Sequence, residues 1–236
     1  MMDQLNIGWE EIPEGNVNLV HLDGLSTVCM GKLPNILAKE VDKLAEDIKS
    51  NNFENQLTAN HQLVGHLQKE FAIPQESLSD DFLSYLVWLA DWAIQHDHNL
   101  YQMFMNNVDY QKLLDPGQIW VNFQKKYEFN PIHNHTGLLS WVIWNKIPYD
   151  IEEEQKVFPE AAKIRQSDYN YTSSFNFIYS NSKIGVIDYP ILVNKAMENY
   201  ICIFPSTLHH CVYPFYTSDD YRISFSGNIF LRDYPK

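Results

Sequence analysis

The stretch that decides the fold is NYICIFPSTLHHCVYPFYTSDDYRISFSGNIF, residues 199–230. It contains short runs of β-branched and aromatic residues, separated by Pro, Ser, Thr and Asp. Runs of this kind, bounded by turn residues, predict β-strands. We therefore predict three consecutive strands, over residues 199–206, 209–216 and 221–230.

The same β-like texture extends upstream as far as residue 117. A turn signal, DPG at 115–117, marks its start. Further strand-like runs occupy residues 118–129, 138–149 and 175–193. Residues 150–170 are polar and charged, and we interpret them as an insertion or lid, or more simply as a solvated surface segment.

The chain before residue 117 has a different, largely helical character. Apolar residues recur at helical spacing within residues 35–50, with Lys, Glu and Asp between them, which predicts an amphipathic helix. A second helix is predicted from about Ser79 to His98, with Ser79 as its N-cap and two aspartates in its first turn. Residues 61–71 fit either a shorter helix or an ordered loop.

Helices followed by many short strands indicate helices packed on a β-sandwich or barrel. We predict an α+β fold, with a double-stranded β-helix (jelly roll) core and packed N-terminal helices. Jelly rolls commonly enclose a ligand cavity. Residues 1–236 are expected to form a single domain, with a mainly helical part at 1–116 and the jelly-roll core at 117–236.

The net charge, the hydropathy and the cysteines indicate which partners and which cellular compartment to expect. The formal net charge of −13 repels nucleic acid backbones and anionic membranes at long range, so neither is expected as a partner. No run of 18 apolar residues is present, and 18 are needed to suggest a membrane-spanning helix. The three cysteines form no CxxC pair and indicate free thiols in a reducing compartment. We expect a cytoplasmic protein.

Two histidine pairs share the spacing His-x-His. On a strand, residues i and i+2 point to the same face, so His133 and His135 can converge on one metal ion. His96 and His98 lie at the end of a predicted helix, where i and i+2 do not face each other. Charge or capping at the helix C-terminus explains that pair. The alternative for His133 and His135 is a place on the surface of a turn.

A second histidine cluster follows in the β region. His209 and His210 are adjacent, so on a strand they face opposite sides and only one can join a site. Arg222 comes 12 residues after His210, and an antiparallel neighbouring strand would bring it back beside this histidine. Ser224 shares its face, and a guanidinium plus a hydroxyl can clamp a carboxylate. The alternative is an arginine at a strand edge and a surface serine.

Three segments together resemble the 2-oxoglutarate and Fe(II)-dependent oxygenases, especially small prolyl-hydroxylase-like members of marine phages and bacteria. They are WVNFQKKYEFNPIHNHTG, LLSWVIWNKIPY and IFPSTLHHCVYPFYTSDDYRISFSGNI. The resemblance covers roughly residues 117–231. It implies an enzyme that hydroxylates a small-molecule or peptide substrate, with release of succinate and CO2 from 2-oxoglutarate.

The resemblance also implies roles for particular residues. The metal ligands for Fe(II) would be His133, His135 and His210. Arg222 would pair with the far carboxylate of 2-oxoglutarate, with Ser224 as its hydroxyl partner. Two further residues, Trp144 and Asn122, would line the cosubstrate pocket.

One position departs from the family pattern. His135 stands where most of the superfamily has Asp or Glu, so the metal would lack its usual negative ligand. The missing carboxylate leaves open an inactive metal- or ligand-binding module on the same scaffold. A second alternative is a cupin-type metalloenzyme, which also uses His-x-His and a later His on a β-barrel. Cupins usually place a Glu shortly after His-x-His, but this chain has Leu139 and Ser140 there. The oligomeric state stays open, with a homodimer among the options.

Overall fold

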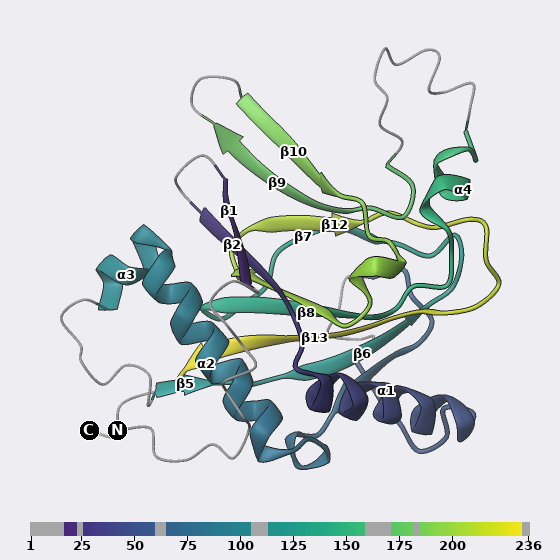
Figure 1. Cartoon of the computed structure of the whole chain (residues 1–236), viewed down its shortest axis with the longest axis horizontal. Helices are drawn as coiled ribbons and strands as arrows, with labels where there is room; N and C mark the ends of the chain where they lie inside the picture. Colours follow the sequence, from purple (N-terminus) through teal and green to yellow (C-terminus); the bar gives the residue numbers. More distant parts are fainter. Residues whose placement is uncertain are drawn as a thin grey trace.

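The computed structural model describes residues 17–22, 26–59, 65–104, 113–158, 171–181 and 185–232. Two antiparallel β-sheets face each other, and helices cover the outer side of the larger sheet (Figure 1). The helices are α1 (Asn35–Ser50), α2 (Asp80–His96), α3 (His98–Phe104) and α4 (Ile151–Gln155), with short 3-10 turns at Gln75–Ser77 and Lys195–Met197.

The larger sheet runs in the order β1-β2-β11-β8-β13-β6-β4-β3, with β5 also paired to β13. Its strands are β1 (Val17–Leu22), β2 (Ser26–Lys32), β3 (Leu57–Thr58), β4 (Glu70–Ile73), β5 (Leu114–Asp115), β6 (Ile119–Gln124), β8 (Leu139–Lys146), β11 (Tyr200–Pro205) and β13 (Arg222–Leu231). The smaller sheet runs β10-β9-β12-β7, with β7 (Asn130–His133), β9 (Phe175–Asn181), β10 (Gly185–Ile191) and β12 (His209–Val212).

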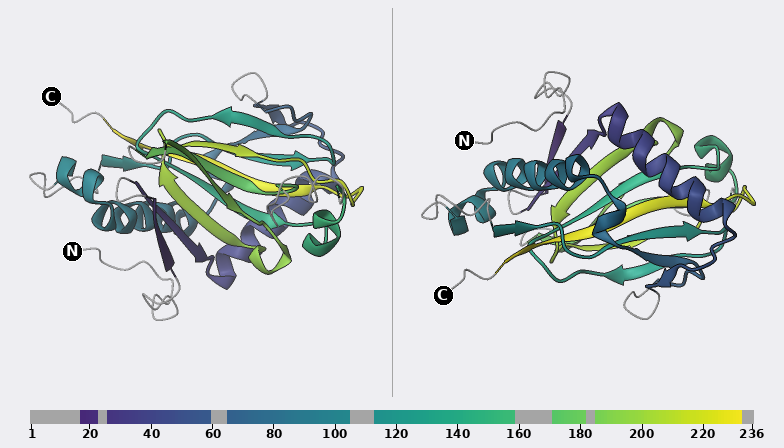
Figure 2. Two further views of the ribbon diagram at one scale, coloured as in Figure 1. Left: turned by 90° about the horizontal axis from the view of Figure 1, so that it is seen from above. Right: turned by 90° about the horizontal axis from the view of Figure 1, so that it is seen from below.

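Both predicted helices form where the sequence places them. The Ser79 side chain accepts a hydrogen bond from the Phe82 N–H, and Asp80 and Asp81 occupy the first turn of α2, as its N-terminal charge favours. The apolar stripe of α1 is buried, including Val41. Seen from below, α1 and α2 lie across the larger sheet (Figure 2).

Two apolar layers result from this arrangement. The outer layer lies between the helices and the larger sheet and contains Leu86 and Trp141. The inner layer lies between the two sheets and contains Trp144, Phe177 and Phe204. The inner layer does not fill the space between the sheets, because a cavity of about 90 Å³ remains there.

A polar row crosses the inner face of the larger sheet beside this cavity. Glu70, Asn122, Ser224 and Trp144 are successive cross-strand partners on β4, β6, β13 and β8. Their strand neighbours point the other way: Phe225, for example, joins the outer apolar layer. Because side chains alternate between faces, the registers bring polar groups from distant segments together on the cavity side.

Two expectations from the sequence need correction. The N-terminal part was predicted as mainly helical, but β1, β2 and β4 also form there, and β2 and β4 pair with β11 and β6. Arg222 was expected on an antiparallel neighbour of the strand of His210, which is wrong. The connection after β12 crosses to the other sheet, so β12 and β13 belong to different sheets.

The polar segment at residues 150–170 is described only in part. Its start forms α4, and Asp150 caps this helix by accepting hydrogen bonds from the Glu152 and Glu153 N–H groups. Residues 159–170, where a lid was one interpretation, lie outside the described residues. Within the described ranges, no helix is both long enough and apolar enough to cross a membrane.

Candidate metal centre

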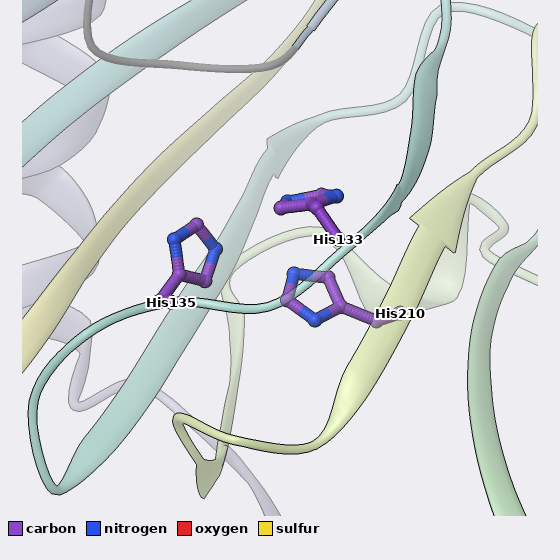
Figure 3. A group of neighbouring side chains, drawn as sticks. All are labelled: His133, His135 and His210. Carbon is purple, nitrogen blue, oxygen red and sulfur yellow. The ribbon is translucent and has the colours of Figure 1, made fainter.

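Three histidines from two segments converge on one point in the cavity. His133 on β7 and His210 on β12 are direct cross-strand partners, and His135 follows two residues beyond His133. Their candidate ligand nitrogens all lie within 4.8 Å of one another. Ring centroids are 4.3 Å apart for His133 and His210, 4.9 Å for His133 and His135, and 5.1 Å for His135 and His210 (Figure 3).

Hydrogen bonds fix the tautomers of two of these rings. His133 Nδ1 lies 2.7 Å from the Pro131 carbonyl oxygen, and His210 Nδ1 lies 3.0 Å from the Leu208 carbonyl oxygen. A carbonyl oxygen only accepts, so each Nδ1 carries the proton and donates it. The lone pair of each Nε2 is therefore left for a metal ion, the arrangement typical of ligating histidines.

Burial keeps the three rings neutral. It lowers the pKa of His135 to about 4, with a smaller contribution from the nearby His133. Burial likewise lowers the pKa of His133, and lowers that of His210 well below its ordinary value. Only neutral imidazole can donate its lone pair to a metal, so the site holds its histidines in the ligating state at neutral pH.

Neighbouring groups hold His210 and His135 in place. Phe175 stacks on His210 with ring centroids 5.4 Å apart, and Phe204 meets the same ring edge-on at 4.9 Å. The His135 backbone N–H donates to the Ser206 carbonyl at 2.9 Å, which fixes the loop after β7. His209 is exposed on the opposite face of β12, so only one of the adjacent pair joins the cluster, in line with the argument from strand geometry.

Arg222 lines the same cavity and is 4% exposed. Its Nε and Nη2 both donate to Gln124 Oε1, at 3.0 and 2.7 Å. Nη1 donates to the Ser173 carbonyl at 2.8 Å and to the Tyr149 hydroxyl at 3.1 Å. Nη2 also donates to the Tyr213 carbonyl at 3.0 Å. All the N–H groups of the guanidinium thus have protein acceptors, and these contacts were not predicted from the sequence.

These acceptors are all neutral. Among the described residues, no carboxylate forms an ion pair with Arg222, so its buried positive charge has no matching negative charge in contact. Ser224 shares its cavity-facing side, as expected. Asn122 Nδ2 lies 3.5 Å from Ser224 Oγ, and Trp144, 3% exposed, packs edge-on against Phe175. The structure therefore places all the predicted site residues around one cavity.

Several other residues that line the cavity could not be singled out from sequence patterns. Glu70, Gly65, Asn130 and Gln124 also border the cavity. Glu70 is 1% exposed, and burial together with the charge of Glu128 raises its pKa to about 7. One signal was available, namely a charged residue at the start of the apolar run EFAI, but its significance depends on pairing with β6.

Comparison with known proteins supports the oxygenase resemblance. Residues 118–228 match the family model described as "Putative 2OG-Fe(II) oxygenase". The structure is similar to a crystal structure of a prolyl-4-hydroxylase from Pseudomonas putida, with a TM-score of 0.52 and 13% sequence identity. The similarity covers 88% of this chain and 93% of that one. No curated protein sequence matches the chain.

The family match confirms the resemblance to the 2-oxoglutarate and Fe(II)-dependent oxygenases, and the fold is similar to that of a prolyl hydroxylase. The family match spans β6 to β13 and so includes all three clustered histidines and Arg222. At 13% identity, the hydroxylase structure is informative about the fold alone.

Proposed function

We propose that the protein is a 2-oxoglutarate- and Fe(II)-dependent dioxygenase that hydroxylates a small-molecule or peptide substrate. The observation that carries the proposal is the cluster of His133, His135 and His210, whose ligand nitrogens lie within 4.8 Å of one another in the cavity between the two sheets. The family match over the same residues supports it.

The donor set suits a divalent iron ion. The three imidazoles are neutral, and two of them have an Nε2 left open by the hydrogen bonds at Nδ1. Three ligands on one side of an octahedral ion leave positions for a chelating cosubstrate and O2. With both bound, the metal centre supplies the oxidising chemistry that couples decarboxylation of 2-oxoglutarate to hydroxylation.

The cavity also suits an anionic cosubstrate. Three neutral ligands leave the charge of a divalent ion uncompensated, and Arg222 adds a buried cation without an ionic partner among the described residues. A dicarboxylate would balance both. Ser224 and Asn122 would hydrogen-bond to it, and Trp144 would form an apolar wall beside it.

The contacts of Arg222 define how the far carboxylate would bind. Nε and Nη2 form the edge of a guanidinium that can donate two parallel hydrogen bonds to one carboxylate. Gln124 Oε1 occupies this edge. We propose that 2-oxoglutarate either displaces the Gln124 carboxamide or binds through the charge of Arg222 and the hydroxyl of Ser224.

The same contacts favour a second candidate function. An arginine whose N–H groups all have protein acceptors also fits a metal-binding module that holds no 2-oxoglutarate. This candidate would bind a divalent ion at the three histidines without turning over a cosubstrate.

One experiment separates the two. The purified chain is loaded anaerobically with Fe(II), titrated with 2-oxoglutarate, and followed by the visible charge-transfer absorption that an Fe(II)–2-oxoglutarate chelate produces. Succinate release is then measured on admitting O2. A dioxygenase gives both signals, and both disappear in His210→Ala. Tight metal binding with neither signal would establish the non-catalytic module.

The remaining expectations complete the proposal. The two facing antiparallel sheets are consistent with a double-stranded β-helix core, and the prolyl-4-hydroxylase similarity supports this arrangement. We propose that residues 1–236 form one catalytic unit that acts on a small-molecule or peptide substrate rather than on nucleic acid or a membrane.

A further inference from the structure

A second polar cluster borders the same cavity on its β4 side. Glu70 is the direct cross-strand partner of Asn122, and Asn130 lies on β7. Gly65 closes the cluster: a Cβ atom there would lie 2.5 Å from Asn130 Oδ1 and 2.9 Å from Glu70 Oε1. All four residues line the cavity. The absence of a side chain at residue 65 is what allows the carboxyl and the carboxamide to sit together.

Two carboxamide oxygens of the cluster lack a donor among the residues that the structure describes. Asn122 is 6% exposed, and its Oδ1 atom is buried with no hydrogen-bond partner among them. The same holds for the buried Oδ1 atom of Asn130. Leaving buried acceptors unsatisfied costs free energy, so such atoms call for an explanation by strain, catalysis, bound water, an ion or another ligand. Both belong to a hollow lining, which favours a ligand.

The cluster does not belong to the metal site. Among the described residues, the group whose ligand atoms lie within 4.8 Å of one another consists of the three histidines alone, without Glu70. Nor does the cluster include Arg222, whose donors are directed to other acceptors. It is a separate acceptor-rich corner of the cavity.

We propose that Glu70, Asn122 and Asn130 form a substrate subsite that binds a primary ammonium group, such as the end of a lysine-like side chain. This proposal extends the proposed dioxygenase function, and the ammonium compound is a substrate only if that function holds. The binding chemistry itself requires only the cluster.

Both hydrogen bonding and charge support this ligand. An ammonium group has three N–H donors and no acceptor, and it meets one carboxyl and two carboxamide oxygens. Burial and the charge of Glu128 raise the pKa of Glu70 in the free protein. A bound cation would favour the ionised carboxylate again. The net charge of −13 attracts cations toward the molecule and repels anions.

The ammonium subsite and the proposed cosubstrate site share one wall. Asn122 stands between Ser224 and Glu70 in the cross-strand row, with Nδ2 3.5 Å from Ser224 Oγ and with Oδ1 lacking a partner within the described ranges. The carboxamide can thus donate to a carboxylate on one side and accept from an ammonium on the other. A cationic substrate and an anionic cosubstrate would occupy adjacent, oppositely charged corners.

The test is a calorimetric titration of the full chain with two matched probes. Nα-acetyl-lysine methylamide carries the ammonium group, and Nα-acetyl-norleucine methylamide has the same backbone without it. n-Butylamine serves as a smaller ammonium probe. We expect both ammonium compounds to bind at least about tenfold more tightly than the norleucine compound, since a charge-assisted hydrogen bond corresponds to about ten- to a hundred-fold in affinity.

Three variants locate the site. Glu70→Gln keeps the shape and removes the charge, and should remove the preference for the ammonium probes. Gly65→Ala crowds Asn130 and Glu70 and should weaken ammonium binding. Glu76→Gln changes the net charge equally but at an exposed residue of the Gln75–Ser77 turn, and should bind like the wild type.

The outcomes separate this proposal from the enzyme function. Failure of both ammonium probes to outbind the norleucine compound overturns the subsite, as does an unchanged preference in Glu70→Gln. Fe(II) and 2-oxoglutarate binding are measured on the same samples. If both bind while the ammonium probes do not, the dioxygenase function stands without this subsite. If the probes bind but 2-oxoglutarate does not, the subsite stands and the dioxygenase function fails.

Discussion

The chain contains His-x-His twice, and the two copies have different fates. His96 sits at the end of α2, where its Nδ1 contacts the Trp92 carbonyl at 2.7 Å and its ring stacks on Trp92 at 4.0 Å. Both it and His98 are exposed. His133 and His135 instead turn into a cavity, where their ring centroids lie 4.9 Å apart.

The difference lies in what a second segment supplies. Opposite His133 stands His210, brought there by the pairing of β7 with β12. Nothing comparable faces the helical pair among the described residues, because no other candidate ligand cluster occurs there. Two histidines two residues apart become a candidate metal site only when a neighbouring strand adds a third ligand and burial keeps all three neutral.

The largest expected effect is on metal content. His210→Ala and His135→Ala should each lose most of the bound divalent ion, because two imidazoles alone hold such an ion poorly. His209→Ala should retain it, as should the double variant of His96 and His98, whose rings lie outside the cavity. Metal analysis after gel filtration measures the content. Full retention by His210→Ala would shift the assignment to His209 and erase the contrast between the two pairs.

The next effect concerns a similar contrast between two arginines. Arg222→Ala would leave several buried acceptors unsatisfied, each costing about 1–3 kcal/mol, so we expect a loss of more than about 3 kcal/mol in unfolding free energy. Arg232 pairs with Asp115 at the surface, with its side chain 62% exposed, and Arg232→Ala should cost less than about 1 kcal/mol.

Urea unfolding measures both arginine variants. An Arg222→Ala protein of near-normal stability that has lost 2-oxoglutarate affinity would show that the arginine mainly serves the cosubstrate. Equal destabilisation by both variants would show that the hydrogen bonds of Arg222 contribute no more than an exposed ion pair.

A third effect distinguishes the histidine pairs by pH. In the metal-free protein, burial lowers the pKa of His135 from 6.5 to about 4. Between these values the unfolded chain binds the proton and the folded chain does not, so stability falls as pH falls from 6.5 to 4. At about 1.36 kcal/mol for each pH unit, this gap corresponds to on the order of 3 kcal/mol.

Chelator-treated protein unfolded in urea at several pH values provides the measurement. His135→Ala should show a shallower loss of stability over this range than the wild type, whereas His96→Ala should follow the wild type. Parallel curves for all three proteins would mean that His135 is not held neutral by burial.

Much of the fold was predictable from local pattern. The helix over residues 35–50 follows from periodicity, and strands β6, β8, β11, β12 and β13 form within or near the runs predicted from β-branched residues and turn signals. Strands β9 and β10 form within the predicted run 175–193, whereas β7 was not predicted as a strand. Strands β1 and β2 were missed, and their place in the sheet comes from pairing: β2 pairs with the distant β11, and β1 pairs with β2. Pairing between distant segments is invisible in a local pattern.

The candidate site divides in the same way. His133 and His135 were recognisable from spacing, and His210 from the family pattern. The contacts of Arg222 with Gln124 and with carbonyls of two loops depend on how those loops close, which no spacing rule describes. Glu70 was missed for a similar reason, since its place in the cavity comes from the register of β4 against β6.

The smallest expected effect tests whether a histidine is needed at residue 135 or whether any ligand suffices. The loop carrying residue 135 is fixed by its backbone N–H bond to the Ser206 carbonyl, so His135→Asp should keep the chain path. An aspartate is shorter than a histidine, but it adds the negative ligand that most of the superfamily has there. Carboxylate ligands also suit Fe(II) while imidazole alone suits Zn(II), Ni(II) and Cu(II) as well.

We therefore expect Fe(II) affinity within about tenfold of the wild type, or about 1.4 kcal/mol, and a lower preference for Cu(II) over Fe(II). Competition between the two ions, followed by succinate release under Fe(II), measures both. Loss of iron binding in His135→Asp would show that the reach of an imidazole sets this site. An unchanged ion preference would show that residue 135 does not govern the choice of metal.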